Sequence, residues 1–121
     1  MGEDIADPEV TVAQYYERVD ADDVAGIVEL FSADAVYRRP GYAPITGRAA
    51  LEDFYRNQRI IKSGRHTVTA LIRCGDDVAV QGRFTGVLHD GSPAEVEFAD
   101  FYRMHGGVFA ERTTYFYAPL V

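Results

Sequence analysis

The second half of the sequence constrains the fold most, because it contains four long runs in which apolar and polar side chains alternate. The runs cover residues 66–74, 78–89, 94–105 and 108–117. A period of two is typical of strands, whose successive side chains point to opposite faces of a sheet. Short segments with Gly, Asp or Ser separate the runs and are typical of hairpin turns. This half therefore predicts a four-stranded antiparallel meander.

The N-terminal segment predicts a first helix over residues 8–20. Asp7 followed by Pro8 is typical of an N-cap with proline at the first helical position. Tyr15 and Tyr16 are adjacent in this helix, so only one of them is expected to face fully inward.

Two further helices and a short strand are expected before the meander. The second helix, capped by Asp22 or Asp23, carries an apolar stripe that extends to Phe31. A strand over 35–39 is stopped by a Pro-Gly pair, and a third helix is expected over 48–61. The chain is thus predicted to form a single α+β domain, a cone-shaped, mostly antiparallel curved sheet covered by three N-terminal helices. The apolar mouth of such a cone is a natural small-molecule site.

The composition argues against several classes of function. Twelve basic and nineteen acidic residues give a net charge of −7, which is unfavourable for a nucleic-acid or anionic-membrane surface. No apolar run approaches membrane-spanning length and no signal-peptide pattern is present, so a cytoplasmic protein is expected. The single Cys74 and the spacing of the three histidines offer no metal framework, and no phosphate or dinucleotide fingerprint is found. Neither a metal nor a cofactor is expected.

One charged residue stands on an otherwise apolar strand face. In the third run, Val96, Phe98, Tyr102 and Met104 share this face with Asp100. A buried carboxylate without partners is too costly to stay ionised, so Asp100 must be paired, hydrogen-bonded or protonated. Perturbed acids gather at functional sites, although structural ion pairs also perturb acids. Asp100 is therefore a candidate functional residue, with a structural acid as the alternative.

Four segments together resemble a known family. They are the Leu-Phe-x-x-Asp-Ala pattern at 30–35, the Pro-Gly break at 40–41, the Gly-x-x-x-Leu helix start at 47–51 and the Asp-Phe-Tyr-Arg segment at 100–103. In this register the sequence resembles the SnoaL-like, ketosteroid isomerase-like branch of the NTF2-like superfamily, over nearly the whole chain. The resemblance implies the α+β cone and a homodimer. It leaves the activity open, because the superfamily includes isomerases, cyclases, dehydratases, epoxide hydrolases and non-catalytic modules.

The resemblance also implies roles for individual residues. Tyr15 and a protonated Asp100 would correspond to the oxyanion hole of the isomerase, and Tyr55 to a second tyrosine that hydrogen-bonds the first. Arg39 occupies the position of the isomerase's general base, and an arginine stays protonated and cannot shuttle a proton between carbons. The base is therefore either Asp100, made ionic by an arginine, or a strand residue such as His66.

Alternatives remain open for the charged residues. Asp100 is either a functional group or a buried acid paired with Arg39 or Arg112. Arg39 is an exposed charge, the partner of Asp100, or a ligand for an anionic or carbonyl group of a substrate. Arg38 and Arg39 alternate, so one should point inward and the other outward. The side chains expected to contact the substrate are Tyr42, Tyr55, His66, Phe98, Tyr102 and Phe116.

Two hypotheses about function follow. The first is a cofactor-independent enzyme that acts on an apolar, ring-containing carbonyl compound, with Tyr15 and Asp100 polarising the carbonyl for an isomerase- or cyclase-type proton transfer. The second is a non-catalytic module that binds a small ligand in the same pocket, which the missing base supports. Epoxide hydrolysis is not expected, because it would need a second inward aspartate near the arginine.

Overall fold

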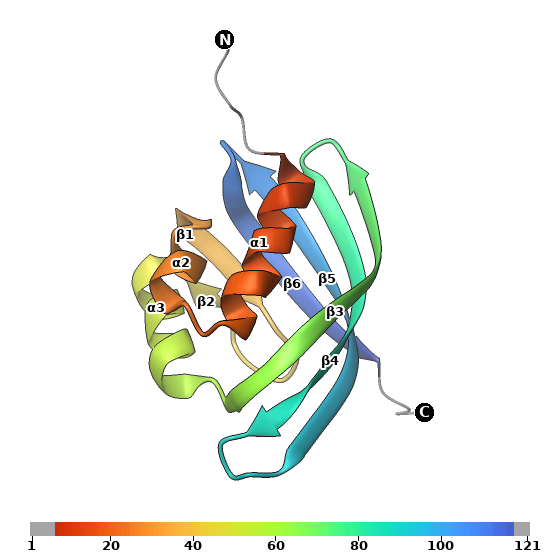
Figure 1. The fold of residues 1–121 in the computed structure, drawn as a ribbon. Helices are drawn as coiled ribbons and strands as arrows, with labels where there is room; N and C mark the ends of the chain where they lie inside the picture. The colour runs from red at the N-terminus through yellow and green to blue at the C-terminus, as the bar shows by residue number, and fades with distance from the viewer. Residues whose placement is uncertain (1–6, 118–121) are drawn as a thin grey trace.

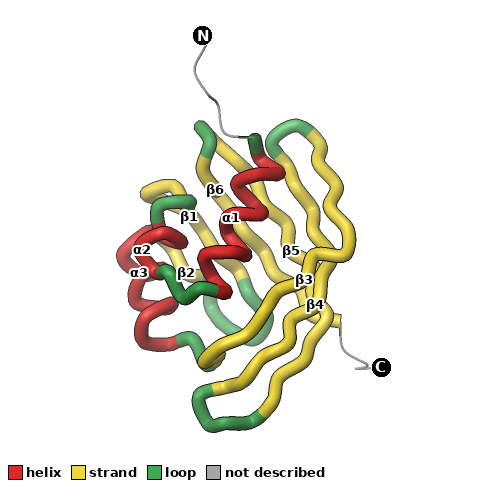
Figure 2. Tube along the Cα trace, viewed as in Figure 1, coloured by secondary structure: helices red, strands yellow, loops and turns green. Residues whose placement is uncertain are grey.

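The computed structural model describes residues 7–117, which form a six-stranded sheet with helices on one face (Figures 1 and 2). The strand order is β2-β1-β6-β5-β4-β3, and only the β1–β6 pair is parallel. The predicted α+β class with a mostly antiparallel sheet is confirmed. The elements are α1 (Pro8–Asp20), α2 (Val24–Val28), β1 (Phe31–Arg38), β2 (Ile45–Thr46), α3 (Arg48–Asp53), a π-helical turn η1 (Phe54–Gln58), β3 (Ile61–Cys74), β4 (Asp77–Leu88), β5 (Pro93–His105) and β6 (Val108–Tyr117).

Helix α1 begins and ends where the sequence predicts. The Asp7 side chain accepts a hydrogen bond from the backbone N–H of Glu9 at 2.9 Å, and Pro8 occupies the first turn, where a missing N–H costs nothing. The helix lies across the sheet (Figure 1) and buries one face against it. None of the helices in residues 7–117 is long and apolar enough to cross a membrane.

The second helix is shorter than predicted, and the expectation that it extends to Phe31 is wrong. Helix α2 ends at Val28, and Phe31 begins β1. Phe31 belongs to the sheet because β1 runs parallel to β6, and Phe31 pairs there with Phe109. The Phe109 N–H also donates to the Leu30 carbonyl at 2.8 Å. Pairing with a strand distant in sequence therefore overrides the helical pattern of this segment.

The third helix is also shorter than predicted. Helix α3 ends at Asp53 and passes into η1, in which the Arg59 N–H donates to the Phe54 carbonyl at 2.9 Å. Strand β3 then begins at Ile61, five residues earlier than the alternating pattern predicts. A π-turn shifts the direction of the side chains that follow it, and such turns are frequent at functional sites. Here the turn directs Phe54, Tyr55 and Arg59 toward the same cavity.

The predicted meander is confirmed as the successive antiparallel pairs of β3, β4, β5 and β6. Gly64 and Gly86 face each other across β3 and β4, and the ring of Phe84 lies over them. A Cβ atom at Gly86 would lie 2.3 Å from the Ser63 carbonyl oxygen and 2.6 Å from Cζ of Phe84. The two glycines therefore let the strands and this aromatic ring approach closely.

We expect the Gly86→Ala substitution to lower the free energy of unfolding by about 1–3 kcal/mol, because the added methyl group collides with backbone rather than with a flexible side chain. Chemical denaturation measures this change. Thr85→Ala, at the exposed neighbouring position, is the control and should change stability by less than about 1 kcal/mol. Equal effects of the two substitutions would contradict the close approach.

Candidate functional site

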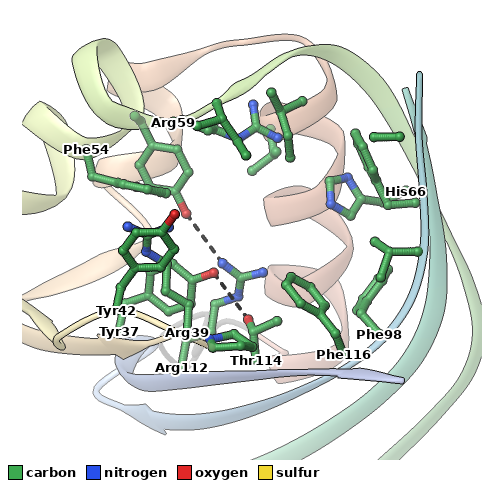
Figure 3. A pocket seen from close by; sticks show the side chains of 18 of the residues that line it. Tyr37, Arg39, Tyr42, Phe54, Arg59, His66, Phe98, Arg112, Thr114 and Phe116 are labelled. Carbon is green, nitrogen blue, oxygen red and sulfur yellow. Dashed lines mark hydrogen bonds between the residues drawn. The ribbon is translucent and has the colours of Figure 1, made fainter. Parts of the chain in front are cut away.

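A cavity of about 330 Å3 opens between the helices and the inner face of the sheet (Figure 3). Most of its wall is apolar, and the exposed side chains of Tyr42, Ile60 and Phe116 lie at its mouth. Its size is at the lower end of the range of small-molecule sites, about 300–1,000 Å3. Polar side chains reach it from Tyr15, Tyr37, Tyr55, Arg39, Arg59, Arg112, His66 and Thr114.

Arg112, on β6, connects the polar groups of the cavity. Its Nη1 donates to the hydroxyl of Tyr15 at 2.6 Å and to that of Tyr55 at 3.5 Å, and its Nη2 donates to Asp100 Oδ2 at 2.9 Å. The side chain is almost fully buried. Burial acts to lower the pKa of the guanidinium, but the Asp100 carboxylate and the surrounding phenols raise it well above its usual value. Arg112 is therefore a buried permanent cation.

Asp100 lies behind this arginine and is 0% exposed. It accepts hydrogen bonds from Arg112, from Tyr16 at 2.5 Å, from Tyr102 at 3.4 Å and, over a short contact, from Thr114. Of the two partners considered from the sequence, the structure places Arg112 beside Asp100. The carboxylate holds two cavity-lining side chains, Arg112 and Thr114, and is not itself part of the lining.

Tyr15 and Tyr55 form a hydroxyl pair at 2.5 Å, which confirms the contact that the family resemblance implied. Burial raises the pKa of Tyr15 well above its usual value and that of Tyr55 to about 12, so both phenols are neutral near pH 7. Tyr16 is buried as well, because its hydroxyl donates to Asp100. The expectation that only one of the two adjacent tyrosines faces inward is therefore wrong.

His66, on β3, forms a second polar group with Asp20 at the end of α1. Its Nδ1 lies 2.6 Å from Asp20 Oδ1, and its backbone N–H donates to Oδ2 at 2.9 Å. Burial lowers the pKa of the imidazole, and this outweighs the raising effect of the carboxylate. The ring is therefore neutral at pH 7, with the Nδ1 proton directed to Asp20. The other nitrogen, Nε2, makes no hydrogen bond within residues 7–117, and the ring lines the cavity (Figure 3).

Arg39 follows β1 and lies at the cavity mouth. Its guanidinium stacks 4.0 Å from the Tyr42 ring centre and 4.2 Å from that of Phe54. The preceding Arg38 points outward and pairs with Glu111 at 2.8 Å. The predicted alternation of the two arginines is confirmed, and Arg39 does not contact the buried carboxylate.

The family model for the SnoaL-like domain matches residues 12–112. The chain belongs to the SnoaL-like family. No curated protein sequence matches this SnoaL-like chain.

Solved structures place this SnoaL-like chain in the NTF2-like fold. An NTF2-like protein of unknown function from Burkholderia pseudomallei K96243 superposes with a TM-score of 0.83 at 19% identity, over 91% of this chain and 90% of the other. SalBIII, an epoxide hydrolase/cyclase-like enzyme of pyran ring formation in salinomycin, gives 0.80 at 20% identity, over 91% and 90%. A hypothetical protein with a ketosteroid isomerase-like fold from Catenulispora acidiphila DSM 44928, in complex with trimethylamine, gives 0.78 at 23% identity, over 90% and 85%. The fold is thus shared by enzymes and by proteins of unknown function.

Most of the side chains predicted for the site come together in this SnoaL-like domain. Asp100 and Tyr102 do not line the cavity, because they lie deeper in the sheet, where Tyr102 packs on Phe109 with ring centres 4.6 Å apart. The predicted side chains that line the cavity are Tyr15, Arg39, Tyr42, Tyr55, His66, Phe98 and Phe116.

The sequence did not single out Thr114, which hydrogen-bonds Asp100, or Asp20, which contacts His66, and it gave Arg112 only as one possible partner of Asp100. A regular hairpin about Gly106 and Gly107 would have placed Glu111 opposite Tyr102 and Thr113 opposite Asp100. A β-bulge next to Met104 shifts the register by one residue, so that Arg112 pairs with Tyr102 and Thr114 with Asp100. No local pattern connects Asp20 with His66, which are 46 residues apart. Within residues 7–117, no three carboxylate, imidazole or thiol groups lie close enough to hold a metal ion.

We expect Asp100→Asn to lower the free energy of unfolding by about 3–5 kcal/mol, because the Arg112 charge would stay buried without its counterion. The control is Asp77→Asn, which breaks an exposed Asp–Arg pair with Arg103 and should cost about 0–1 kcal/mol. Urea denaturation at pH 7 measures both. A loss for Asp100→Asn as small as that for the control would show that Asp100 is not needed to neutralise Arg112.

The lowered pKa of His66 predicts a pH dependence of stability. The unfolded chain binds this proton more readily than the folded chain does, so the contribution of His66 is fully present above about pH 6.5 and is lost as the pH falls below it. Unfolding free energies measured between pH 7.5 and 5 should therefore decrease less steeply in His66→Gln than in the wild type. The difference is at most about 1.4 kcal/mol per pH unit. Identical slopes would contradict a neutral, buried His66.

Proposed function

We propose that this chain is a cofactor-independent enzyme that polarises a carbonyl of an apolar, ring-containing substrate for an isomerase- or cyclase-type proton transfer. The observation that carries the proposal is the presence of two different polar groups in one apolar cavity. Arg112 with the Tyr15–Tyr55 pair supplies hydrogen-bond donors, and His66, from another wall of the cavity, supplies an unprotonated nitrogen (Figure 3).

The tyrosine pair leaves one donor for a ligand whichever way it is oriented. One hydrogen bond between two hydroxyls uses one of their two hydrogens, and Arg112 donates to the pair rather than accepting from it. A free phenolic hydrogen on Tyr15 or Tyr55 can therefore bind a carbonyl oxygen. As negative charge develops on this oxygen, the nearby guanidinium stabilises it more strongly than water would, because the surroundings are apolar.

His66 fits the role of the base that the Arg39 position cannot supply. Its Nε2 would take a proton from the carbon beside the carbonyl, the C–H electron pair would form the enolate, and the proton would return to another carbon of the ring system. Electrons and atoms balance without a redox partner. Asp20 would hold the tautomer and stabilise the imidazolium that forms.

Asp100 is assigned a positioning role in this mechanism. All the contacts described for it come from donors, and one of these donors is Arg112 itself. It would keep the guanidinium charged and oriented while contacting no substrate atom. This differs from the protonated acid that the family resemblance implied, because a donor into the cavity would have to lie in its lining.

A non-catalytic binding module is the competing function, and the arginine at the usual base position favours it. The donors alone would then hold a ligand oxygen, and His66 would serve only to pack between Phe84 and Phe98, whose ring centres lie 4.8 and 5.5 Å from its own. The two functions differ in one observable, which is proton exchange at the substrate.

The test is deuterium exchange from D2O into the carbon beside the carbonyl of cyclic ketones, followed by NMR, with binding of a fluorescent naphthol as a mimic of the enolate. We expect His66→Gln to slow exchange by about 100- to 10,000-fold while naphthol binding changes little. Tyr15→Phe should weaken naphthol binding and slow exchange. The control is His105→Gln, in an exposed position at the end of β5.

Two outcomes would contradict the proposal, the first for the role of His66 as the base and the second for enzymatic activity as a whole. Unchanged exchange in His66→Gln would place the base elsewhere. Naphthol binding without exchange of any cyclic ketone by the wild type would identify a binding module.

A further inference from the structure

We propose that Arg39 and Arg59 form a carboxylate-binding subsite at the cavity mouth, so that the ligand is a ring compound carrying one carboxylate group. The proposal deepens the proposed function, because it concerns the same cavity. The subsite requires only that the cavity binds a ligand, and it does not require that the ligand is converted to a product.

The distribution of charge gives the first argument. The chain has a net charge of −7, but three arginines and no aspartate or glutamate line the cavity among the described residues. Arg112 is neutralised by Asp100 at 2.9 Å. Arg39 and Arg59 form no ion pair within residues 7–117, where six of the nine other arginine side chains do. In an acidic protein, a cavity whose lining carries an excess of positive charge favours an anionic ligand.

The geometry of Arg39 gives the second argument. Its guanidinium carbon lies 4.0 Å from the ring centre of Tyr42 and 4.2 Å from that of Phe54, so cation–π contacts with two rings hold the side chain in place. Its Nε is buried without a partner, and its terminal nitrogens make no hydrogen bond to residues 7–117. A fixed guanidinium edge presents two parallel N–H donors, which match the two oxygens of a carboxylate. Ordering the side chain before binding lowers the entropy cost of capturing the ligand.

Arg59 adds a second positive charge from the end of the π-turn. Its side chain lines the cavity and lies at the upper wall in Figure 3. Burial has the largest effect on the pKa of Tyr55 and on that of His66. The Arg59 charge acts to lower the pKa of each of these two residues, so Arg59 lies within electrostatic range of both.

The position at the mouth is suited to an acid group. Tyr42 and Ile60 are each 60% exposed beside the two arginines, so a carboxylate there keeps part of its hydration. The ring of the ligand would enter the apolar interior toward Phe84 and Phe98. The cavity therefore matches a ligand with one anionic group at one end and an apolar ring at the other.

The experiment compares binding of 2-naphthoate with that of its neutral isostere 2-naphthamide, by titration calorimetry at low salt. We expect wild type to bind the acid at least about tenfold more tightly than the amide. Arg39→Gln should remove this preference by weakening 2-naphthoate alone, and Arg59→Gln should reduce it. The matched control is Arg38→Gln, which removes the neighbouring arginine that points away from the cavity.

Retained binding of the amide shows that each variant is folded. Equal affinities of wild type for the acid and the amide, binding of neither, or an Arg39→Gln variant that weakens both equally would overturn the subsite. A preference for the acid without deuterium exchange would contradict the proposed enzyme and leave the subsite standing.

Discussion

The buried ion pair between Asp100 and Arg112 is the interaction on which the rest of the site depends. The two residues lie on adjacent strands, and neither is exposed enough to recover its hydration from water. Burying such a pair requires that most of its remaining donors and acceptors are satisfied. Tyr15, Tyr16 and Thr114 supply these contacts, and Arg112 Nε is left without a hydrogen-bond partner among the described residues. The ion pair can therefore be buried only because these aromatic and hydroxyl residues surround it. The hydrogen-bond donors that line the cavity belong to the same set of residues.

The polar side chains of the cavity come from different parts of the fold. The strands β5 and β6 provide a rigid cationic centre, whereas the histidine comes from β3 and is oriented by the end of α1. The end of β1, where the family resemblance implied an acid, is followed by Arg39 instead. The same scaffold can accept such an exchange because the chemistry is determined by a few side chains at the open end of the sheet, not by the fold.

The sequence predicted α1, the four meander strands and a buried Asp100 that must be paired or hydrogen-bonded, because these depend on local periodicity and on one polar residue in an apolar pattern. The Tyr15–Tyr55 contact came from family resemblance alone. The ends of α2 and α3 were wrong, since parallel pairing with β6 and a π-turn override helical propensity there. The Asp20–His66 contact could not be predicted, because it joins a helix end to a strand whose start was itself misplaced.

The parallel pairing of β1 with β6 has a consequence for folding. The first three strands of the meander lie between β1 and its partner β6, so closing this pair requires the ordering of a long loop of chain. Topologies dominated by such distant contacts fold slowly. During synthesis, Phe31 and Tyr37 must remain without their partners on β6 until that strand is made. The cavity, which needs Arg112 from β6, is therefore completed last.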